Sequence, residues 1–296
     1  MSQTIGISAA GTIAIGLVED HRVIASAGGR GVTGESEEDI FHLPMEALVE
    51  SLARSVKTLC AQSDAHPVAL GMGFPGLIRD GVVEESPNLK QAKGAHLQEM
   101  LSLALEAQGI PMPVAVCNDA DAIATGIAAQ RGYLEKFIRV WTLGQGVGFG
   151  RYPHSPGPWE GGHIVVSLDP KESFCGCGGR GHLEGIMGHR AMRLRFMDRE
   201  PEEVFAGAAE GDARCAEFEI LWHRALAAAS ATSIHLEGSG RFFITGPNSR
   251  FVKTGILSQF VQEMVAMSPL QGSVFEVIPV NEEFAITGAA VHAGQA

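Results

Sequence analysis

The hydrophobic positions of this chain follow two spacings. Short apolar runs between glycine, proline and acidic turns predict strands, and apolar residues three or four apart predict helices. The predicted strands cover residues 5–8, 13–18, 22–27, 68–74, 82–83, 114–117, 137–143, 242–245 and 274–278. The predicted helices cover residues 37–63, 97–108, 122–130, 184–197, 202–209, 212–236, 249–267 and 284–293, the first with Ser36 as its N-cap.

The order of these elements predicts an α/β protein. A hairpin opens the chain, strands then alternate with helices, and the same kind of alternation returns in the second half. Such an order places helices on the faces of largely parallel sheets. At 296 residues the chain is longer than a typical single domain. We therefore expect two lobes, residues 1–117 completed by a terminal helix at 284–296, and residues 118–283.

Composition narrows the classes of partner. Hydrophobic residues make up 45% of the chain, charged residues 19%, and the net charge is −12. An acidic chain is a poor match for the phosphate backbone of nucleic acids and for anionic membranes. No apolar run approaches the roughly 18 residues of a membrane span, and no basic leader precedes the first strand. We therefore expect a cytoplasmic protein with no nucleic-acid or membrane partner.

The densest chemistry lies between Glu160 and Glu184. Two cysteines and two histidines fall within this stretch, and thiolate and imidazole are the ligands that zinc prefers in tetrahedral sites. We therefore predict a closed structural zinc site that holds the two carboxylates in place for another task. The alternative is a glycine-rich surface loop with neighbouring cysteines. The predicted metal ligands are His163, Cys175, Cys177 and His182.

A second candidate lies where the strand at 114–117 runs into Asn118, Asp119 and Asp121. Ligands of open α/β sheets bind at the carboxyl ends of strands, so a carboxylate here can face a substrate. Within reach of a hydroxyl, Asp119 could take its proton as a general base. The alternative for Asp119 by itself is a helix N-cap.

A series of motifs in a fixed order gives the chain a recognisable identity. It resembles the ROK family of repressors and sugar kinases, in particular the bacterial glucokinase-like members. The resemblance covers nearly the whole chain and implies a two-lobed, actin-like and ribonuclease H-like sugar kinase fold with a cleft between the lobes. The motifs are Gly-Phe-Pro-Gly at 73–76, Ser-Pro-Asn-Leu at 86–89, Asn-Asp-Ala-Asp-Ala at 118–122, the glycine-rich run at 142–148, Glu-Gly-Gly-His at 160–163, Cys-x-Cys-Gly-x-x-Gly at 175–181 and Thr-Gly-Ala-Ala at 287–290.

The resemblance also implies roles for individual residues. Asp119 would be the catalytic base for phosphorylation of a hexose by ATP with Mg²⁺, and the zinc ion would be structural. A homodimer is the family default. The implied sugar-binding residues are Gly76, Asn88, Asn118, Asp119, Glu160, His163 and Glu184. The implied nucleotide-binding residues are Gly11, Thr12, Gly144, Gln145, Gly146 and Gly246.

The chain departs from the family pattern at both sites. The family's zinc ligands are one histidine and three cysteines, and His182 replaces the third cysteine. The family's opening loop begins with an aspartate that organises hydrated magnesium, where this chain has Ser8. Gln145 replaces a threonine, and Pro247 interrupts the third glycine loop and removes a backbone amide.

Two functions are compatible with the family motifs and with these departures from them. The first is an ATP-dependent hexose kinase, with glucose or an N-acetylated hexosamine as the substrate. The second is a degenerate relative that binds a sugar without transferring phosphate. The presence of Asp119 favours the kinase, whereas Ser8 favours the sugar binder. A DNA-binding repressor is disfavoured, because no helix-turn-helix module precedes the first strand.

Overall fold

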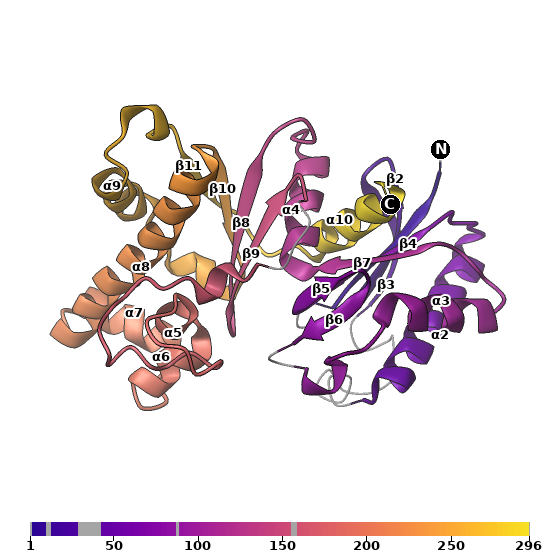
Figure 1. Cartoon of the computed structure of the whole chain (residues 1–296), viewed down its shortest axis with the longest axis horizontal. Helices are drawn as coiled ribbons and strands as arrows, with labels where there is room; N and C mark the ends of the chain where they lie inside the picture. Colours follow the sequence, from indigo (N-terminus) through magenta and orange to yellow (C-terminus); the bar gives the residue numbers. More distant parts are fainter. Residues whose placement is uncertain (1, 10–12, 29–42, 87–88, 155–158, 296) are drawn as a thin grey trace. The chain divides into compact units, whose positions relative to one another are not determined.

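The protein folds into two compact units, seen here in a computed structural model that describes residues 2–9, 13–28, 43–86, 89–154 and 159–295 (Figure 1). Unit 1 contains Met1–Phe137, Gly150–Trp159 and Asn281–Ala296, and unit 2 contains Ile138–Phe149 and Glu160–Val280. Each unit pairs a sheet with helices. The α/β class predicted from the sequence is therefore confirmed.

Unit 1 is built on a five-stranded sheet with the order β3-β2-β1-β4-β7. Strand β2 runs antiparallel to both β1 and β3, whereas β1, β4 and β7 run parallel to one another. Parallel strands need crossover connections, which the intervening helices supply. The strands are β1 Thr4–Ser8, β2 Ala14–Glu19, β3 Arg22–Gly28, β4 Leu70–Phe74 and β7 Val114–Asn118.

The helices of unit 1 cover its sheet and bury its apolar residues. The apolar faces of α2 and α3 pack with the strands into one core that includes Ile5, Leu52 and Leu101, all fully buried. A small antiparallel hairpin, β5-β6, stands outside the large sheet. The remaining elements are α2 Met45–Ser63, β5 Leu77–Arg79, β6 Val82–Glu85, the 3₁₀ turn η2 Lys90–Ala92, α3 Leu97–Ala107, α4 Asp119–Gln130 and α10 Glu282–Gln295.

The first long helix starts later than its apolar spacing predicted. Leu43 and Pro44 are not helical, and α2 begins at Met45. Proline disfavours helical geometry in the residue before it, which explains why the helix does not extend across residue 43. The predicted N-cap, Ser36, and residues 37–42 lie outside the described residues.

Glycines allow α4 and α10 to cross closely inside unit 1 (Figure 1). A Cβ atom on Gly126 would overlap the carbonyl oxygen of Phe284, and one on Gly288 would overlap the carbonyl oxygen of Ala122. This crossing places α4 in unit 1, so the chain divides after Phe137 rather than at the predicted boundary after residue 117.

Replacing Gly288 with alanine should therefore destabilise unit 1. The added methyl group meets backbone rather than a movable side chain, so we expect a loss of about 1–3 kcal/mol or more in the free energy of unfolding. Gly294 on the same helix has open space around its Cβ position and gives a matched control. Gly294→Ala should be neutral or slightly stabilising, and equal urea midpoints for the two variants would contradict this account of the crossing.

Unit 2 contains a four-stranded sheet with the order β11-β10-β8-β9. Strand β10 runs parallel to both of its neighbours, and its residue Phe242 is buried between the sheet and the helices together with Trp141 and Trp222. The end of β9 passes into unit 1. The strands are β8 Ile138–Leu143, β9 Val147–Tyr152, β10 Arg241–Thr245 and β11 Val274–Val277.

Two long predicted helices in unit 2 are interrupted. The helix predicted at 184–197 is split at Gly188, whose backbone is extended. The helix predicted at 249–267 is shorter, because a 3₁₀ turn that starts at Pro247 precedes it. The helical elements are η3 Gly161–His163, α5 Glu184–Met187, α6 His189–Arg195, α7 Pro201–Glu210, α8 Ala213–Glu237, η4 Pro247–Phe251, α9 Thr254–Met264 and η5 Ser268–Leu270.

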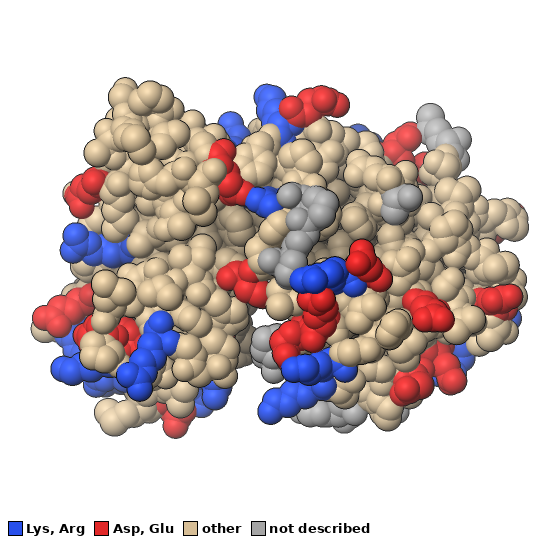
Figure 2. Space-filling view, viewed as in Figure 1, with Lys and Arg blue, Asp and Glu red and all other residues tan. Residues whose placement is uncertain are grey.

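Charged side chains of both signs are interspersed on the face drawn in Figure 2. Acidic and basic groups often lie beside each other on this face (Figure 2). One exposed ion pair of unit 1 joins Arg79 and Glu84, whose atoms Nε and Oε1 are 3.2 Å apart. Among the described residues, no helix combines the length and the apolar character that crossing a membrane requires.

Candidate functional site

The carboxyl ends of three parallel strands meet at one edge of the unit 1 sheet. Residue Ser8 ends β1 and pairs with Gly73 of β4, while Phe74 at the end of β4 pairs with Asn118 at the end of β7. Backbone and side chains at such an edge can converge on one ligand. The sheet thus brings Ser8 and the Asn118–Asp119 pair to the same edge.

The side chain of Asn118 forms hydrogen bonds at the connection between β7 and α4. Its Oδ1 atom accepts hydrogen bonds from the N–H groups of Ala120, at 2.8 Å, and Asp121, at 3.4 Å. Its Nδ2 atom donates to the carbonyl oxygen of Gly76 at 2.9 Å. Gly76 has φ +119° and a Cβ position that would overlap Glu85, so glycine is required there.

Asp119 is the first residue of α4, and Asn118 is its N-cap. The alternative reading of Asp119 as the N-cap is therefore wrong, although its Oδ1 atom also accepts the N–H of Ala120 at 2.9 Å. Burial raises the pKa of the Asp119 carboxyl to about 6. The hydrogen bond from Ala120 opposes this shift, and the charge of Asp121 adds to it. A carboxyl group tuned close to neutral pH suits general base chemistry.

Three of the predicted binding residues fall outside the described parts of the chain. They are Gly11 and Thr12, predicted for the nucleotide, and Asn88, predicted for the sugar. Of the opening loop, the structure describes Ser8, which is 5% exposed, and Ala9, which donates its N–H to the carbonyl oxygen of Gly73. These two described residues offer a hydroxyl group and no carboxylate to a cation.

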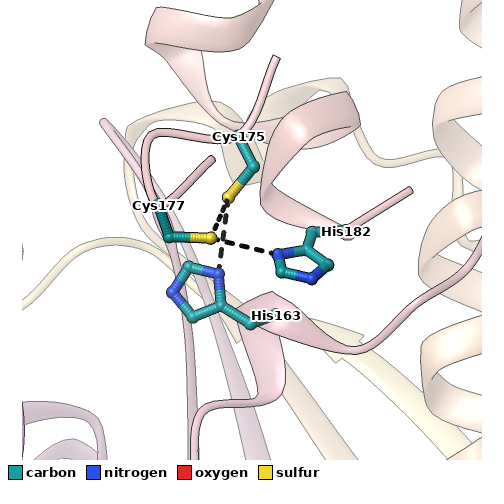
Figure 3. A group of neighbouring side chains, drawn as sticks. All are labelled: His163, Cys175, Cys177 and His182. Carbon is teal, nitrogen blue, oxygen red and sulfur yellow. Dashed lines mark hydrogen bonds between the residues drawn. The ribbon is translucent and has the colours of Figure 1, made fainter. Parts of the chain in front are cut away.

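The four predicted metal ligands of unit 2 converge on one point (Figure 3). The Sγ atom of Cys175 lies 3.4 Å from Nδ1 of His163 and 3.4 Å from Sγ of Cys177. The Sγ atom of Cys177 lies 3.3 Å from Nδ1 of His182. All four ligand atoms lie within 4.8 Å of one another. The sequence prediction that these residues form one cluster is confirmed.

The geometry of this cluster fits a tetrahedral zinc ion. Bonds of about 2.3 Å to sulfur and about 2.0 Å to nitrogen separate zinc ligands by about 3.3–3.8 Å. The three distances given above, 3.3–3.4 Å, lie in this range. Burial lowers the pKa of His182, which favours the neutral imidazole that a metal needs. Burial also raises the pKa of Cys175 to about 12, so a cation is needed to hold its thiolate.

Glu184 joins the cluster to the turn between β8 and β9. Its Oε1 atom accepts from Sγ of Cys175 at 3.6 Å, and its Oε2 atom accepts from the N–H of Val147 at 3.1 Å. Glu160 caps η3, and its carbonyl oxygen accepts the N–H of His163 at 3.0 Å. Unit 2 thus places the predicted sugar ligands Glu160 and Glu184 on the frame that carries the metal ligands.

The predicted phosphate loop of unit 2 is the turn Gly144, Gln145 and Gly146. The carbonyl oxygen of Gly144 accepts from the backbone N–H of His189 at 3.0 Å and from Nδ2 of Asn248 at 3.3 Å. The Gln145 residue is exposed at the tip, and a Cβ atom on Gly146 would overlap Oε2 of Glu184.

The third glycine loop is anchored beside this turn. Gly246 has φ +99°, and a Cβ atom there would overlap the carbonyl oxygen of Leu143. Pro247 follows as the first residue of η4, a position where its missing N–H has no partner inside the helix. The departure from the family pattern at Pro247 is therefore compatible with the local fold.

Two residues of unit 1 received no role from the sequence. Asp121 is the second carboxylate of the motif at 118–122. Its position two residues after Asp119 is the sequence feature that could have indicated a role for it. His154 lies in a segment with no recognisable motif, and its 3.4 Å approach to Oδ2 of Asp121 depends on the tertiary fold.

Comparison with known proteins places the chain in a family. A model of the ROK family matches residues 24–291. A glucokinase from Pyrobaculum calidifontis is 30% identical over 182 residues, which cover 57% of this chain and 58% of the relative. An N-acetylmannosamine kinase from Haemophilus influenzae is 30% identical over 184 residues, which cover 58% of this chain and 60% of the relative. The chain thus spans about six-tenths of the length of these curated relatives.

A solved structure supports the same assignment at the level of the fold. The ROK family glucokinase from Streptomyces griseus, determined in complex with glucose and AMPPNP, superimposes with a TM-score of 0.69 at 21% identity, and the match covers 100% of both chains. The family resemblance predicted from the sequence is therefore confirmed. Since the family model extends over most of its length, the chain belongs to the ROK family.

Proposed function

We propose that this protein is a sugar kinase that transfers a phosphoryl group from ATP to a primary hydroxyl of a hexose. The observation that carries this proposal is Asp119, a carboxyl group at the end of β7 whose pKa burial raises to about 6. The two curated relatives, a glucokinase and an N-acetylmannosamine kinase, support the same reaction class. They also support glucose or an N-acetylated hexosamine as the substrate.

In this reaction Asp119 acts as the general base. Its carboxylate accepts the proton of the sugar hydroxyl as the hydroxyl oxygen forms a bond to the γ-phosphorus of ATP. The bond between the γ-phosphorus and the bridging oxygen breaks, and ADP leaves with that oxygen. Above its pKa of about 6 the Asp119 carboxyl is ionised and able to accept the proton.

Other polar groups in each unit are assigned to sugar hydroxyl groups. In unit 1 they are Asn118 and the backbone of Gly76. In unit 2 they are Glu160, His163 and Glu184. Carboxylates and amides suit a hexose, because each can bind two neighbouring hydroxyl groups. In His163, Nδ1 faces Cys175, so Nε2 is the nitrogen assigned to a hydroxyl.

We assign zinc a structural role in unit 2. Four protein ligands complete a tetrahedral shell and leave no position for a substrate. A bound zinc ion would neutralise the thiolates of Cys175 and Cys177 and hold the chain between η3 and α5. The backbone turn Gly144–Gln145–Gly146 and Gly246 are assigned to the nucleotide. Ser8 provides no carboxylate for Mg²⁺ at the end of β1, so no step is assigned through that cation.

A second function, sugar binding without phosphoryl transfer, is favoured by Ser8. Mg²⁺ is usually held by one or two carboxylates together with phosphate and water. The hydroxyl group of Ser8 is buried and uncharged, and Ala9 beside it has no polar side chain. A protein that kept the sugar ligands and lost the cation ligand would bind hexoses and form no ADP.

An assay of ADP formation separates the two functions. Glucose, N-acetylglucosamine, N-acetylmannosamine, fructose and allose would be tested with ATP over a series of Mg²⁺ concentrations, with calorimetry of sugar binding beside it. ADP formation that depends on one hexose supports the kinase. Sugar binding without ADP at every Mg²⁺ concentration supports the binding protein. The cytoplasmic location and the homodimer stay predictions.

A further inference from the structure

Asp121 is a buried carboxylate that the proposed reaction does not use. Its residue is 3% exposed and lies in the first turn of α4, two positions after Asp119. Its Oδ1 atom accepts the backbone N–H of Arg151 at 2.9 Å, and its Oδ2 atom lies 3.4 Å from Nδ1 of His154. Both contacts reach the same segment, Gly150–Trp159, which returns to unit 1 from unit 2.

The described parts of this segment lie closely against α4. A Cβ atom on Gly150 would overlap the carbonyl oxygen of Ala120, so glycine permits the approach. At the other end, the guanidinium carbon of Arg151 stacks over the ring of Trp159 at 3.6 Å from its centroid. Arg151 therefore contacts Asp121 through its backbone and Trp159 through its side chain. The chain continues directly from Trp159 into Glu160, a predicted sugar ligand.

The charges that face Asp121 come from four elements of unit 1. On α4 itself, burial and the negative charge of Asp121 both raise the pKa of Asp119. On β7, the same two causes raise the pKa of the Cys117 thiol. The returning segment contributes Arg151 and His154. On α10, His292 lies with its ring centroid 5.4 Å from that of His154, and burial lowers the pKa of His292.

We propose that Asp121 is a positioning residue whose carboxylate fastens Arg151 and His154 to the first turn of α4 and sets the electrostatic environment of Asp119. Both effects come from one group, because the oxygen atoms bind the segment while the negative charge acts on the neighbouring carboxyl group. A pocket of about 520 Å³ lined by Asn118, Asp121, His154 and His292 lets solvent reach this cluster.

The value of this fastening for catalysis rests on the proposed function, whereas the fastening itself does not. In the proposed kinase, Asp119 must keep its position on α4 and its ionised form. Loss of the Asp121 charge alone should make Asp119 a stronger acid, since two nearby negative charges oppose each other's ionisation. Loss of the whole side chain should also release the Arg151 amide.

Hydrogen exchange at the Arg151 amide tests the fastening directly. In Asp121→Ala this amide should exchange roughly 10- to 100-fold faster than in the unchanged protein, because a hydrogen bond to a charged acceptor is lost. Asp121→Asn keeps an oxygen acceptor and should change the exchange rate far less. Thr125→Ala, a buried position one turn further along α4, is the control and should leave the Arg151 amide unchanged.

Titration of the Asp119 carboxyl, followed by carbon NMR, tests the electrostatic part. Asp121→Asn should move its titration to lower pH, and the acid limb of kcat/KM should move with it. Unchanged exchange in Asp121→Ala would overturn the fastening, and an unmoved Asp119 titration in Asp121→Asn would overturn the electrostatic role. If no hexose is phosphorylated, the proposed function fails while both of these measurements still decide the inference. If Asp121→Ala does not fold, the asparagine variant still decides the electrostatic part.

Discussion

Asp119→Asn is expected to lower kcat for hexose phosphorylation by roughly 10²–10⁴-fold, the usual contribution of a general base. An asparagine side chain has nearly the same size and can still accept the N–H of Ala120, so α4 should keep its first turn. The amide cannot accept the hydroxyl proton. Sugar affinity, measured by calorimetry, should stay within about tenfold, because the other proposed sugar ligands are unchanged. Retained turnover in this variant would refute the assignment of the base.

The same residue fixes the direction of the pH dependence. Asp119 must be ionised to accept a proton, and burial raises its pKa to about 6. We therefore expect kcat/KM to fall as the pH drops through about 6 and to level off above about pH 7. Thr125→Ala serves as a control for disturbance of α4 and should keep this profile. A rate that does not change between pH 5 and 7 would argue against Asp119 as the titrating group.

Loss of the proposed zinc ion is expected to have the largest effect on stability. Metal binding in small zinc domains contributes about 10–16 kcal/mol, comparable with the whole stability of many proteins. Even a loss of about 4 kcal/mol should lower the melting temperature by roughly 10 °C. Cys175→Ser should produce this loss together with loss of bound zinc, measured by calorimetry and by metal analysis of the purified protein.

Matched variants separate metal binding from packing. Cys60→Ser, a buried thiol far along the chain from the metal ligands, should leave the zinc content unchanged. His182→Cys keeps a soft ligand and should retain zinc, whereas His182→Ala should lose it. A folded, purified protein that contains no zinc would contradict the structural metal site.

Local signals in the sequence located most strands and the cluster of two cysteines and two histidines. The hairpin β1-β2 followed from two apolar runs joined by small residues, and the metal ligands lie within twenty positions of one another along the chain. Such features depend on residues that are close together in the sequence, so they can be predicted from the pattern of residues. Strand β9 was missed, because glycines at 148 and 150 hide an edge strand inside a glycine-rich run.

Features that depend on distant contacts were not accessible from the sequence. The division of the chain follows from the crossing of α4 and α10, where the backbone of Phe284 meets Gly126. The contact between His154 and Asp121 joins residues that are more than thirty positions apart. Periodicity describes the faces of single elements, and it does not specify which elements meet.

The placement of α10 has a consequence for synthesis of the protein on the ribosome. Its residues Ile286 and Ala289 lie directly over Gly6 of β1 and Gly71 of β4, so the earliest and latest described elements of the chain pack together. Unit 2 is complete in sequence at Val280, whereas unit 1 still lacks this helix at that point of the chain. Domains generally fold as units, so unit 1 should complete its fold only after the chain of unit 2 has been synthesised, although unit 1 is translated first. A nascent chain stalled before α10 would expose the glycine-rich face of the first sheet.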